Sequence, residues 1–203
     1  MVLILLCARL SVWQFDRAEQ KASLEQSARE SLAAAPEVLS GDTPLRPYLR
    51  AAAAGVYLPQ KQIFLDNRVR DKIAGMHIIT PLLLDDGAAV AVNRGFVARD
   101  ATPPPPPEGR VTVRGVLQKD GADAFTLSSQ TESGDLWQNL DLQKYAAAAD
   151  LPLLTLALFA QNVAAPAEVR VDFRSARSIG YALQWATFGA LAFIFYLVLS
   201  FRK

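Results

Sequence analysis

The sequence has very few residues of the kinds that bind metals. It contains one cysteine, Cys7, and one histidine, His77, and its two methionines are Met1 and Met76. A single cysteine cannot form an intrachain disulfide or a CxxC pair, and a single histidine cannot build a multi-histidine metal site. We therefore expect no metal site within one copy of the chain, and a thiol-based metallochaperone is excluded.

The sequence also lacks the features of a hydrolase and of a nucleic-acid-binding protein. A catalytic nucleophile needs an activating base, and His77 is the one imidazole available. No G-x-S-x-G nucleophile elbow occurs. The formal net charge is +1 and no basic stripe runs along the chain, so binding to DNA or RNA is not predicted. We expect a protein that is not an enzyme.

A long apolar segment lies near the C-terminus. Residues Ile179 to Phe201 carry no charge, and basic residues flank them on both sides. At about 1.5 Å of helical rise per residue the run reaches roughly 34 Å, enough to cross a hydrocarbon core about 30 Å thick. A buried helix of a soluble protein is the alternative. We predict a transmembrane helix over residues 177–201, followed by a basic tail at 202–203.

The N-terminal segment is apolar but short. Residues 1–15 reach about 22 Å as a helix, and Arg9 lies in their middle. The basic leader and the small-residue cleavage site of a signal peptide are missing. We interpret residues 1–15 as the C-terminal part of a first transmembrane helix that begins upstream. Residues 16–36, rich in charge and alanine and stopped by Pro36, are predicted to continue as a membrane-exit helix.

The remaining residues, 37–176, are numerous enough for one domain with its own core. Short segments with strand patterns follow one another there, with turn residues between them. The predicted fold class is membrane-anchored α+β: two terminal transmembrane helices, the first of them truncated, flank a small, mainly antiparallel β domain with one or two helices. The predicted elements are strands at 62–65, 110–117, 153–160 and 168–173, a hairpin of 77–84 with 88–97, a helix at 140–149, and a polyproline II connector at 103–107.

Several short motifs occur along the chain in a fixed order. They are Trp13-Gln14 with Arg17 and Lys21; Leu65-Asp66-Asn67-Arg68; Gly75 with Thr80-Pro81 and Asp86-Gly87; Val92-Asn93-Arg94-Gly95-Phe96-Val97; and Tyr181-Ala182 with Trp185. In this order they resemble the Surfeit-locus family of cytochrome c oxidase assembly factors, which includes the yeast Shy protein. Phe96 stands where that family usually has tryptophan. The resemblance runs nearly from end to end.

The resemblance implies a non-enzymatic assembly factor for haem-copper cytochrome c oxidase. Such a factor assists haem a insertion or the maturation of subunit I by holding membrane partners, here subunit I and, as a further candidate, haem a synthase. The expected location is the bacterial inner membrane, as a multi-pass protein with its central domain on the periplasmic side. Because no arginine- and serine-rich transit segment precedes the apolar start, the mitochondrial inner membrane is the less favoured location. A generic bitopic adaptor or sensor with no haem role is the alternative function.

One departure from the family pattern bears on haem a. Members commonly carry a histidine, implicated in haem a binding, three residues before the tyrosine of the second span, and here that position is Ser178. A hydroxyl is a poor iron ligand beside a neutral imidazole. Either the chain has given up haem ligation, or it holds a partner while another protein handles the haem.

Three other residues remain as candidates for haem contact. His77 offers an imidazole, although a lone strand histidine is more often a surface or hydrogen-bonded residue. Arg68 and Arg94 offer guanidinium groups that bind carboxylates such as haem propionates. The alternative, which we favour, is that these two arginines pair inside the sheet with Asp66, Asp85 or Asp86.

The predicted partner-binding residues fall into two sets. The first, which we call the collar, lies where the helices are expected to leave the membrane. Gln184 within it should face protein, because an amide in hydrocarbon seeks a hydrogen-bond partner. The second set is expected to shape the end of a predicted strand, where a glycine permits a bulge or a close backbone approach. An ordinary membrane-exit helix would explain much of the collar equally well. The collar is Trp13, Gln14, Arg17, Lys21, Tyr181, Gln184 and Trp185, and the strand set is Asn93, Arg94 and Gly95.

Overall fold

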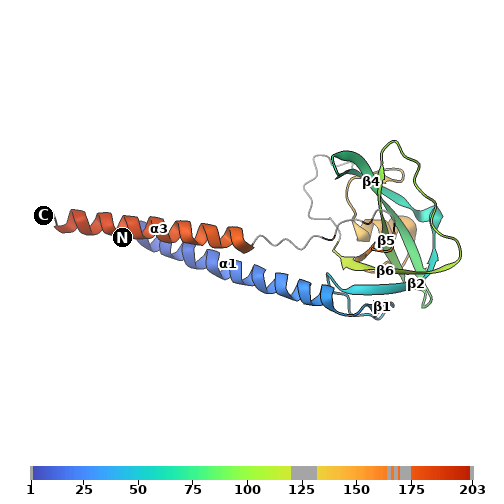
Figure 1. Cartoon of the computed structure of the whole chain (residues 1–203), viewed down its shortest axis with the longest axis horizontal. Coiled ribbons are helices and arrows are strands. Elements are labelled where there is room, and N and C mark those ends of the chain that lie inside the picture. Colours follow the sequence, from blue (N-terminus) through green and yellow to red (C-terminus); the bar gives the residue numbers. More distant parts are fainter. Residues whose placement is uncertain (1, 120–131, 164–165, 167–168, 170–174, 202–203) are drawn as a thin grey trace. The chain divides into compact units, whose positions relative to one another are not determined.

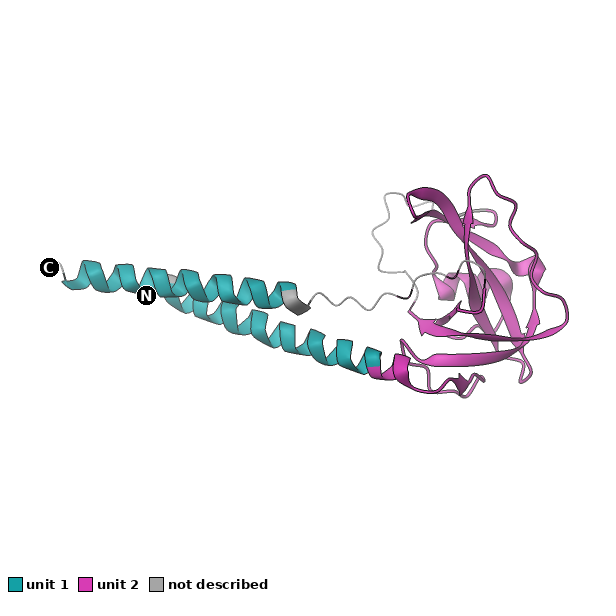
Figure 2. Ribbon diagram, in the orientation of Figure 1, with its two compact units in different colours: residues 1–29, 171–203 teal, residues 30–170 magenta. Residues whose placement is uncertain are grey.

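The computed structural model describes residues 2–119, 132–163, 166, 169 and 175–201. The chain divides into two compact units (Figure 2). One comprises residues 1–29 and 171–203, and the other comprises residues 30–170. The first unit is helical and the second is rich in β-strands.

Two long helices form the first unit. Helix α1 is Val2–Ala33, of which residues up to 29 belong to this unit, and α3 is Ser175–Phe201. The two helices run antiparallel and side by side (Figure 1). Ser11 Oγ on α1 donates a hydrogen bond to the Ala182 carbonyl on α3 over 3.0 Å. The contact between helices therefore joins residues from opposite ends of the sequence.

Small residues line the contact between α1 and α3. A Cβ atom added at Gly189 would lie 3.3 Å from Cys7 Cβ, so the two backbones approach closely there. Small side chains permit this approach, as they do between helices in membranes. The buried small residues are Cys7, Ser11 and Ala18 on α1, and Ser178, Ala182 and Gly189 on α3.

Within the described residues, one helix is long and apolar enough to cross a membrane. It covers Arg177–Phe201 within α3, and nearly all of its surface is exposed on this chain. The helix itself begins at Ser175, two residues before the predicted start, and the predicted tail at 202–203 lies outside the described residues. The span predicted over 1–15 stays a prediction: α1 is one uninterrupted helix across residues 15 and 16, and it ends at Ala33 before Pro36.

Five strands of the second unit close into a barrel. The neighbours β2, β6, β9, β5 and β4 form a ring, and pairing between β2 and β4 closes it. Two-residue strands and β3 extend the sheet beyond the ring. The bounds are β1 Glu37–Val38, β2 Arg50–Tyr57, β3 Ile63–Arg70, β4 Ile73–Leu84, β5 Ala89–Ala98, β6 Arg110–Gln118, β7 Glu132–Ser133, β8 Leu136–Trp137 and β9 Ala157–Ala160, with a 3-10 helix at Pro59–Lys61.

Apolar side chains fill both faces of the barrel wall. On β5, Val90 and Val92 belong to the interior core, whereas Ala91 belongs to a second core on the outside. Helix α2, Leu142–Ala149, covers that outer core. The Asp141 carboxylate caps α2 by accepting hydrogen bonds from two backbone N–H groups of its first turn. Tyr145 fixes α2 to the sheet, since its hydroxyl donates to the Lys61 carbonyl over 2.6 Å.

The predicted fold class is confirmed for the β-rich domain. The hairpin, the strand at 110–117 and the helix at 140–149 are present as β4 with β5, β6 and α2. The strand expected at 62–65 extends to Arg70. Of the strand expected at 153–160, residues 157–160 form β9, and Leu153 forms an isolated bridge with Ala89. The strand at 168–173 falls outside the described residues apart from Val169. Strand β2 was missed, because its run of alanines favours helix over strand when tertiary context is ignored.

Candidate functional site

The α1 part of the collar begins with a stacked pair. The Arg17 guanidinium lies over the Trp13 ring, 5.6 Å from its centroid, and both side chains are exposed. A guanidinium over an indole face is held by a cation–π attraction. Gln14, by contrast, is half-buried toward α3. Trp13 and Arg17 are thus presented together on the outside of the helix pair.

Lys21 turns inward to the residue that replaces the expected histidine. Its Nζ donates a hydrogen bond to Ser178 Oγ over 2.9 Å, and Ser178 is only 4% exposed. A hydroxyl that accepts from an ammonium, buried between two helices, has neither the basicity nor the access needed to bind iron. The residues at this position do not fit a haem iron.

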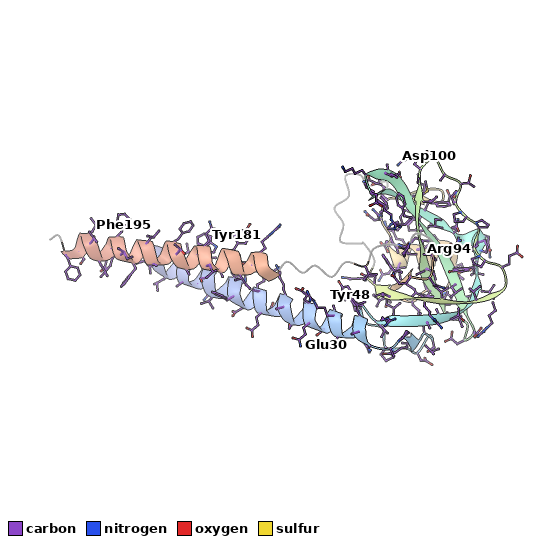
Figure 3. All side chains as sticks on the ribbon, viewed as in Figure 1. Glu30, Tyr48, Arg94, Asp100, Tyr181 and Phe195 are labelled. Carbon is purple, nitrogen blue, oxygen red and sulfur yellow. The ribbon has the colours of Figure 1, made fainter. Side chains whose placement is uncertain are left out.

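The α3 part of the collar faces outward. Tyr181 and Gln184 are exposed, and Trp185 is half-buried with its ring edge-on to Phe188 at 6.0 Å between centroids. Figure 3 shows Tyr181 projecting from the surface of α3. The expectation that Gln184 faces protein is not met inside this chain, because α1 packs on the other side of α3. The Gln184 amide is exposed, so it can contact a neighbouring molecule or the lipid boundary.

The strand set lies around a bulge in β5. The partners across β4 and β5 run from His77 opposite Phe96 to Ile79 opposite Asn93, so β5 carries one extra residue between them. Gly95 has a φ of 105°, a conformation that side chains other than glycine rarely adopt. Its N–H donates to Asn93 Oδ1 over 3.0 Å. The bulge expected at Gly95 is confirmed, and it lies within the strand because β5 continues to Ala98.

The bulge directs Arg94 onto the proline segment, residues 103–107. Its guanidinium donates to the carbonyls of Pro104 and Pro105 over 3.1 and 2.7 Å. It also donates to Gln62 Oε1 over 3.2 Å and lies 5.6 Å from the centroid of the Tyr57 ring. Burial raises the pKa of Tyr57 to about 12, so this ring is a neutral phenol at physiological pH. Arg94 is labelled on the barrel in Figure 3.

Neither Arg68 nor Arg94 forms one of the favoured ion pairs with Asp66, Asp85 or Asp86 within the described residues, although the charge of Asp66 acts on Arg68. Asp66 forms its ion pair with Arg99, and Asp85 pairs with Arg110. Arg68 donates to the Gln138 carbonyl over 3.1 Å instead. Both arginines thus donate hydrogen bonds to carbonyl oxygens.

The Asp86 carboxylate is engaged by backbone. It accepts hydrogen bonds from the N–H groups of Gly41 and Ala88 over 2.6 and 3.0 Å. These bonds lower the pKa of Asp86, because they stabilise the charged carboxylate. Asp86 thus organises the turn between β4 and β5 and holds the segment before β2 against it.

His77 lines a polar hollow of about 880 Å³ on the barrel. Its Nδ1 lies 3.2 Å from the Asn93 amide nitrogen, and its ring meets Phe96 edge-on at 6.4 Å between centroids. Burial, and then the charges of Arg68 and Arg70, lower the pKa of His77 to about 4. The imidazole is therefore neutral at pH 7. Besides His77 and Phe96, the hollow is lined by Asn67, Arg68, Arg70 and Gln161.

The three residues proposed for haem contact do not converge on one site. Arg68 shares the hollow of His77, whereas Arg94 lines a second hollow of about 580 Å³ with Tyr57 and the proline segment. Phe96 borders both hollows. The described residues contain no group of three histidine, cysteine or acidic side chains placed to hold a metal ion.

Sequence reasoning missed two residues that hold Arg94 in place. Gln62 Oε1 accepts from both Arg94 and Thr80 Oγ1, the latter over 2.8 Å. Tyr57 comes from β2, the strand that the sequence did not reveal. Neither residue carries a signal in the sequence, because each gains its role only from the pairing of distant strands.

The structure thus defines a class: a protein with a closed β barrel and a helix pair, of which one helix has the length and composition of a membrane span. The chain belongs to the SURF1 family, whose family model matches residues 1–190. The match covers α1, the barrel and α3 as far as residue 190, so it includes every predicted site residue.

Curated relatives agree with this family. A SURF1-like protein from Monosiga brevicollis is 26% identical over 152 residues, which cover 66% of this chain and 58% of that protein. A SURF1-like protein from Rickettsia bellii is 24% identical over 153 residues, 71% of this chain and 62% of the relative. An uncharacterized SURF1-like protein from Mycobacterium tuberculosis is 28% identical over 114 residues, 53% of this chain and 42% of the relative. The matched part of the chain spans about two fifths to three fifths of these relatives.

Proposed function

We propose that this protein is a membrane-anchored assembly factor for haem-copper cytochrome c oxidase. It assists haem a insertion or the maturation of subunit I by holding membrane partners, and it does not act by catalysis. Membership of the SURF1 family over residues 1–190 is the observation that carries this proposal. The span within α3 supports it, because a partner of an integral subunit is held most directly from within the same bilayer.

The outward half of the collar is the proposed contact with the partner. Trp13, Arg17, Tyr181 and Gln184 are exposed and do not build the contact between α1 and α3. Aromatic and arginine side chains of this kind dominate the energy of protein interfaces. Lys21, in contrast, is engaged by Ser178 and is assigned a role inside the helix pair.

Arg94 is proposed to act on the partner surface indirectly. Its hydrogen bonds to Pro104 and Pro105 position the proline segment against the barrel. The proline segment is therefore the part of this region that would meet a partner, and Asn93 and Gly95 place Arg94 by forming the bulge.

The protein is proposed to work without an iron ligand at Ser178. The hydroxyl there is buried and engaged, so the partner or a haem-delivering enzyme would have to supply the axial ligands of haem a. We propose a multi-pass location in a bacterial inner membrane with the barrel on the periplasmic side. Subunit I and haem a synthase are the proposed partners.

Affinity purification of the tagged full-length chain from solubilised membranes tests the proposal. Subunit I should copurify, and a double variant Trp13→Ala with Gln184→Leu should recover at least fivefold less of it. Val198→Leu, a conservative change at an exposed position of α3 outside the collar, is the matched control and should recover as much as the wild type. Failure of subunit I to copurify, together with normal oxidase levels in a deletion strain, would favour the adaptor function.

A second measurement separates the haem question from the assembly role. The chain is purified from cells that synthesise haem a, and its absorption spectrum is recorded. We expect no haem band attributable to Ser178, so a Ser178→Ala variant should give the same spectrum as the wild type. A haem signal that Ser178→Ala removes would overturn the assignment of Ser178 as a packing residue.

A further inference from the structure

A seam of exposed residues runs along α1 on the side away from α3. Successive residues of an α-helix are turned by about 100°, so Arg9, two residues from both Cys7 and Ser11, points opposite to those two buried side chains. The spacing along the seam alternates between three and four residues, which is the pattern that packs helices by knobs into holes. The seam consists of Val2, Leu5, Arg9, Val12 and Asp16, all exposed.

Arg9 lies deep along the span if α3 crosses a membrane. Along α1 it falls between Cys7, which packs on Gly189, and Ser11, which bonds to the Ala182 carbonyl. These two positions of α3 lie about 8 and 18 Å beyond Arg177 at 1.5 Å per residue. Arg9 is therefore near the midplane of a hydrocarbon core about 30 Å thick.

The helix pair supplies no counter-charge to Arg9 within the described residues. Helix α3 contains no acidic residue, and no ion pair of the described residues involves Arg9. The neighbours of Arg9 one turn away on α1 are apolar, and the nearest acid on the helix, Asp16, is two turns away. Helical side chains also lean toward the helix N-terminus, which turns Arg9 away from the interface near Asp16.

We propose that this seam binds a transmembrane helix of another integral membrane protein, and that this helix carries a carboxylate opposite Arg9. The inference rests on the proposed membrane location of α3. Charge complementarity selects the partner: a cation at this depth is tolerated when it faces protein and pairs with an opposite charge. A charged residue with apolar seam residues on both sides of it also fixes the register of the two helices.

A second copy of the chain does not satisfy the same requirement. Two α1 seams in a shared membrane orientation would place Arg9 against Arg9. Asp16 of the other copy would be about 10 Å away along the helix, too far for an ion pair. The seam therefore selects a partner of different sequence.

Photo-crosslinking in native membranes tests the inference. The full chain carries p-benzoylphenylalanine at Val12, beside Arg9 on the seam, and adduct peptides are identified by mass spectrometry. We expect an adduct within a transmembrane segment of another protein, no more than two turns from an aspartate or glutamate. Arg9→Leu and Arg9→Gln should each lower its yield at least fivefold, whereas Arg9→Lys should stay within twofold. Thr187→Leu, on the face of α3 turned away from α1, should leave the yield unchanged.

A charge exchange gives the decisive result. Arg9→Asp should abolish the adduct, and replacing the partner's acidic residue by arginine should restore it in that variant. An adduct that persists in both Arg9→Leu and Arg9→Gln, or that forms only with lipid or with another copy of the chain, would overturn the inference.

Carbonate extraction separates the two proposals. Release of the wild-type chain from membranes would refute the membrane location and the seam together. Retention of the chain, combined with an adduct insensitive to Arg9, would refute the seam alone.

Discussion

The Arg94 guanidinium makes several contacts within the barrel unit. It reaches the carbonyls of Pro104 and Pro105, the Gln62 amide oxygen and the face of Tyr57. A planar guanidinium can serve these partners at once because its N–H groups point in fixed, diverging directions. Arg94, which the sequence suggested as a contact for haem propionates, therefore holds the proline segment against the barrel.

Arg94→Lys should destabilise the barrel although it keeps the charge. A lysine ammonium cannot reach all these acceptors in the same geometry, and lost hydrogen bonds of a charged donor cost about 1.5–3 kcal/mol. Urea unfolding of the full chain in detergent measures the loss. Arg99→Lys is the control, because the exposed Arg99–Asp66 pair is worth less than about 1 kcal/mol. Equal stability of the two variants would contradict this structural role of Arg94.

His77 should make the protein sensitive to mild acid. Its pKa falls from about 6.5 in the unfolded chain to about 4 in the folded one, so between these values the unfolded chain binds more protons. Stability therefore falls as the pH drops from 6.5 toward 4, by about 1–2 kcal/mol at pH 5 after allowing for the partial exposure of the ring.

His77→Gln should remove most of this dependence. The measurement is the difference in urea midpoint between pH 7 and pH 5, for the wild type and the variant. As the chain has a single histidine, no other imidazole contributes in this range. An equally large acid-induced loss in His77→Gln would show that the hollow does not keep His77 neutral.

At the scale of elements, the helix pair owes its contact to small residues. Ser11, Ala182 and Gly189 leave room for the backbones of α1 and α3 to approach, and the Ser11 hydroxyl adds a hydrogen bond across the contact. Lys21 and Ser178 add another toward the end of α1 that leads to the barrel. The polar contacts fix the register, because small apolar residues alone would allow one helix to slide along the other.

Gly189→Cys should form a disulfide with Cys7. A Cβ at residue 189 would lie 3.3 Å from Cys7 Cβ, close to the separation of about 3.5–4.5 Å found in disulfides. Mild oxidation followed by non-reducing electrophoresis after cleavage between the helices detects the bond. Phe195→Cys is the control and should stay reduced, because Phe195 is exposed on α3. A free thiol in oxidised Gly189→Cys would contradict this register of the two helices.

At the scale of the whole molecule, the chain joins a closed barrel to a helix whose exposed surface is apolar. Within α3, side chains such as Phe188, Leu191 and Phe195 are exposed although they are large and apolar. A contiguous surface of this kind marks contact with a membrane or a partner. The barrel itself has two buried apolar cores, one inside the ring and one under α2.

Charges placed in α3 should release the protein from membranes. Phe188→Asp with Leu191→Asp puts two carboxylates near the middle of the span, each at a cost of about 2.5–3.5 kcal/mol. Carbonate extraction measures the released fraction, which should rise from near zero in the wild type. Phe188→Leu with Leu191→Val, which preserves the apolar character, should behave as wild type. Retention of the aspartate variant would show that α3 does not anchor the chain.

The sequence by itself determined those elements and motifs that depend only on residues close together along the chain. The uncharged run at 179–201 predicted α3, and local strand, turn and helix patterns predicted the hairpin of β4 with β5, strand β6 and helix α2. The ordered motifs indicated the family, because they can be recognised without knowing the contacts between them. The glycine at residue 95 indicated the bulge, since the conformational freedom of glycine is a property of that residue alone.

Only the tertiary structure decided which distant residues meet. Closure of the barrel depends on the pairing of β2 with β4, and the low strand propensity of the alanines in β2 concealed that strand. The contacts of Arg94 with Gln62 and Tyr57, the bond between Lys21 and Ser178, and the contact of His77 with Asn93 all join residues more than fifteen positions apart in the sequence. Periodicity tells which face of an element is buried, but the partner on that face depends on packing and register, which no local pattern encodes.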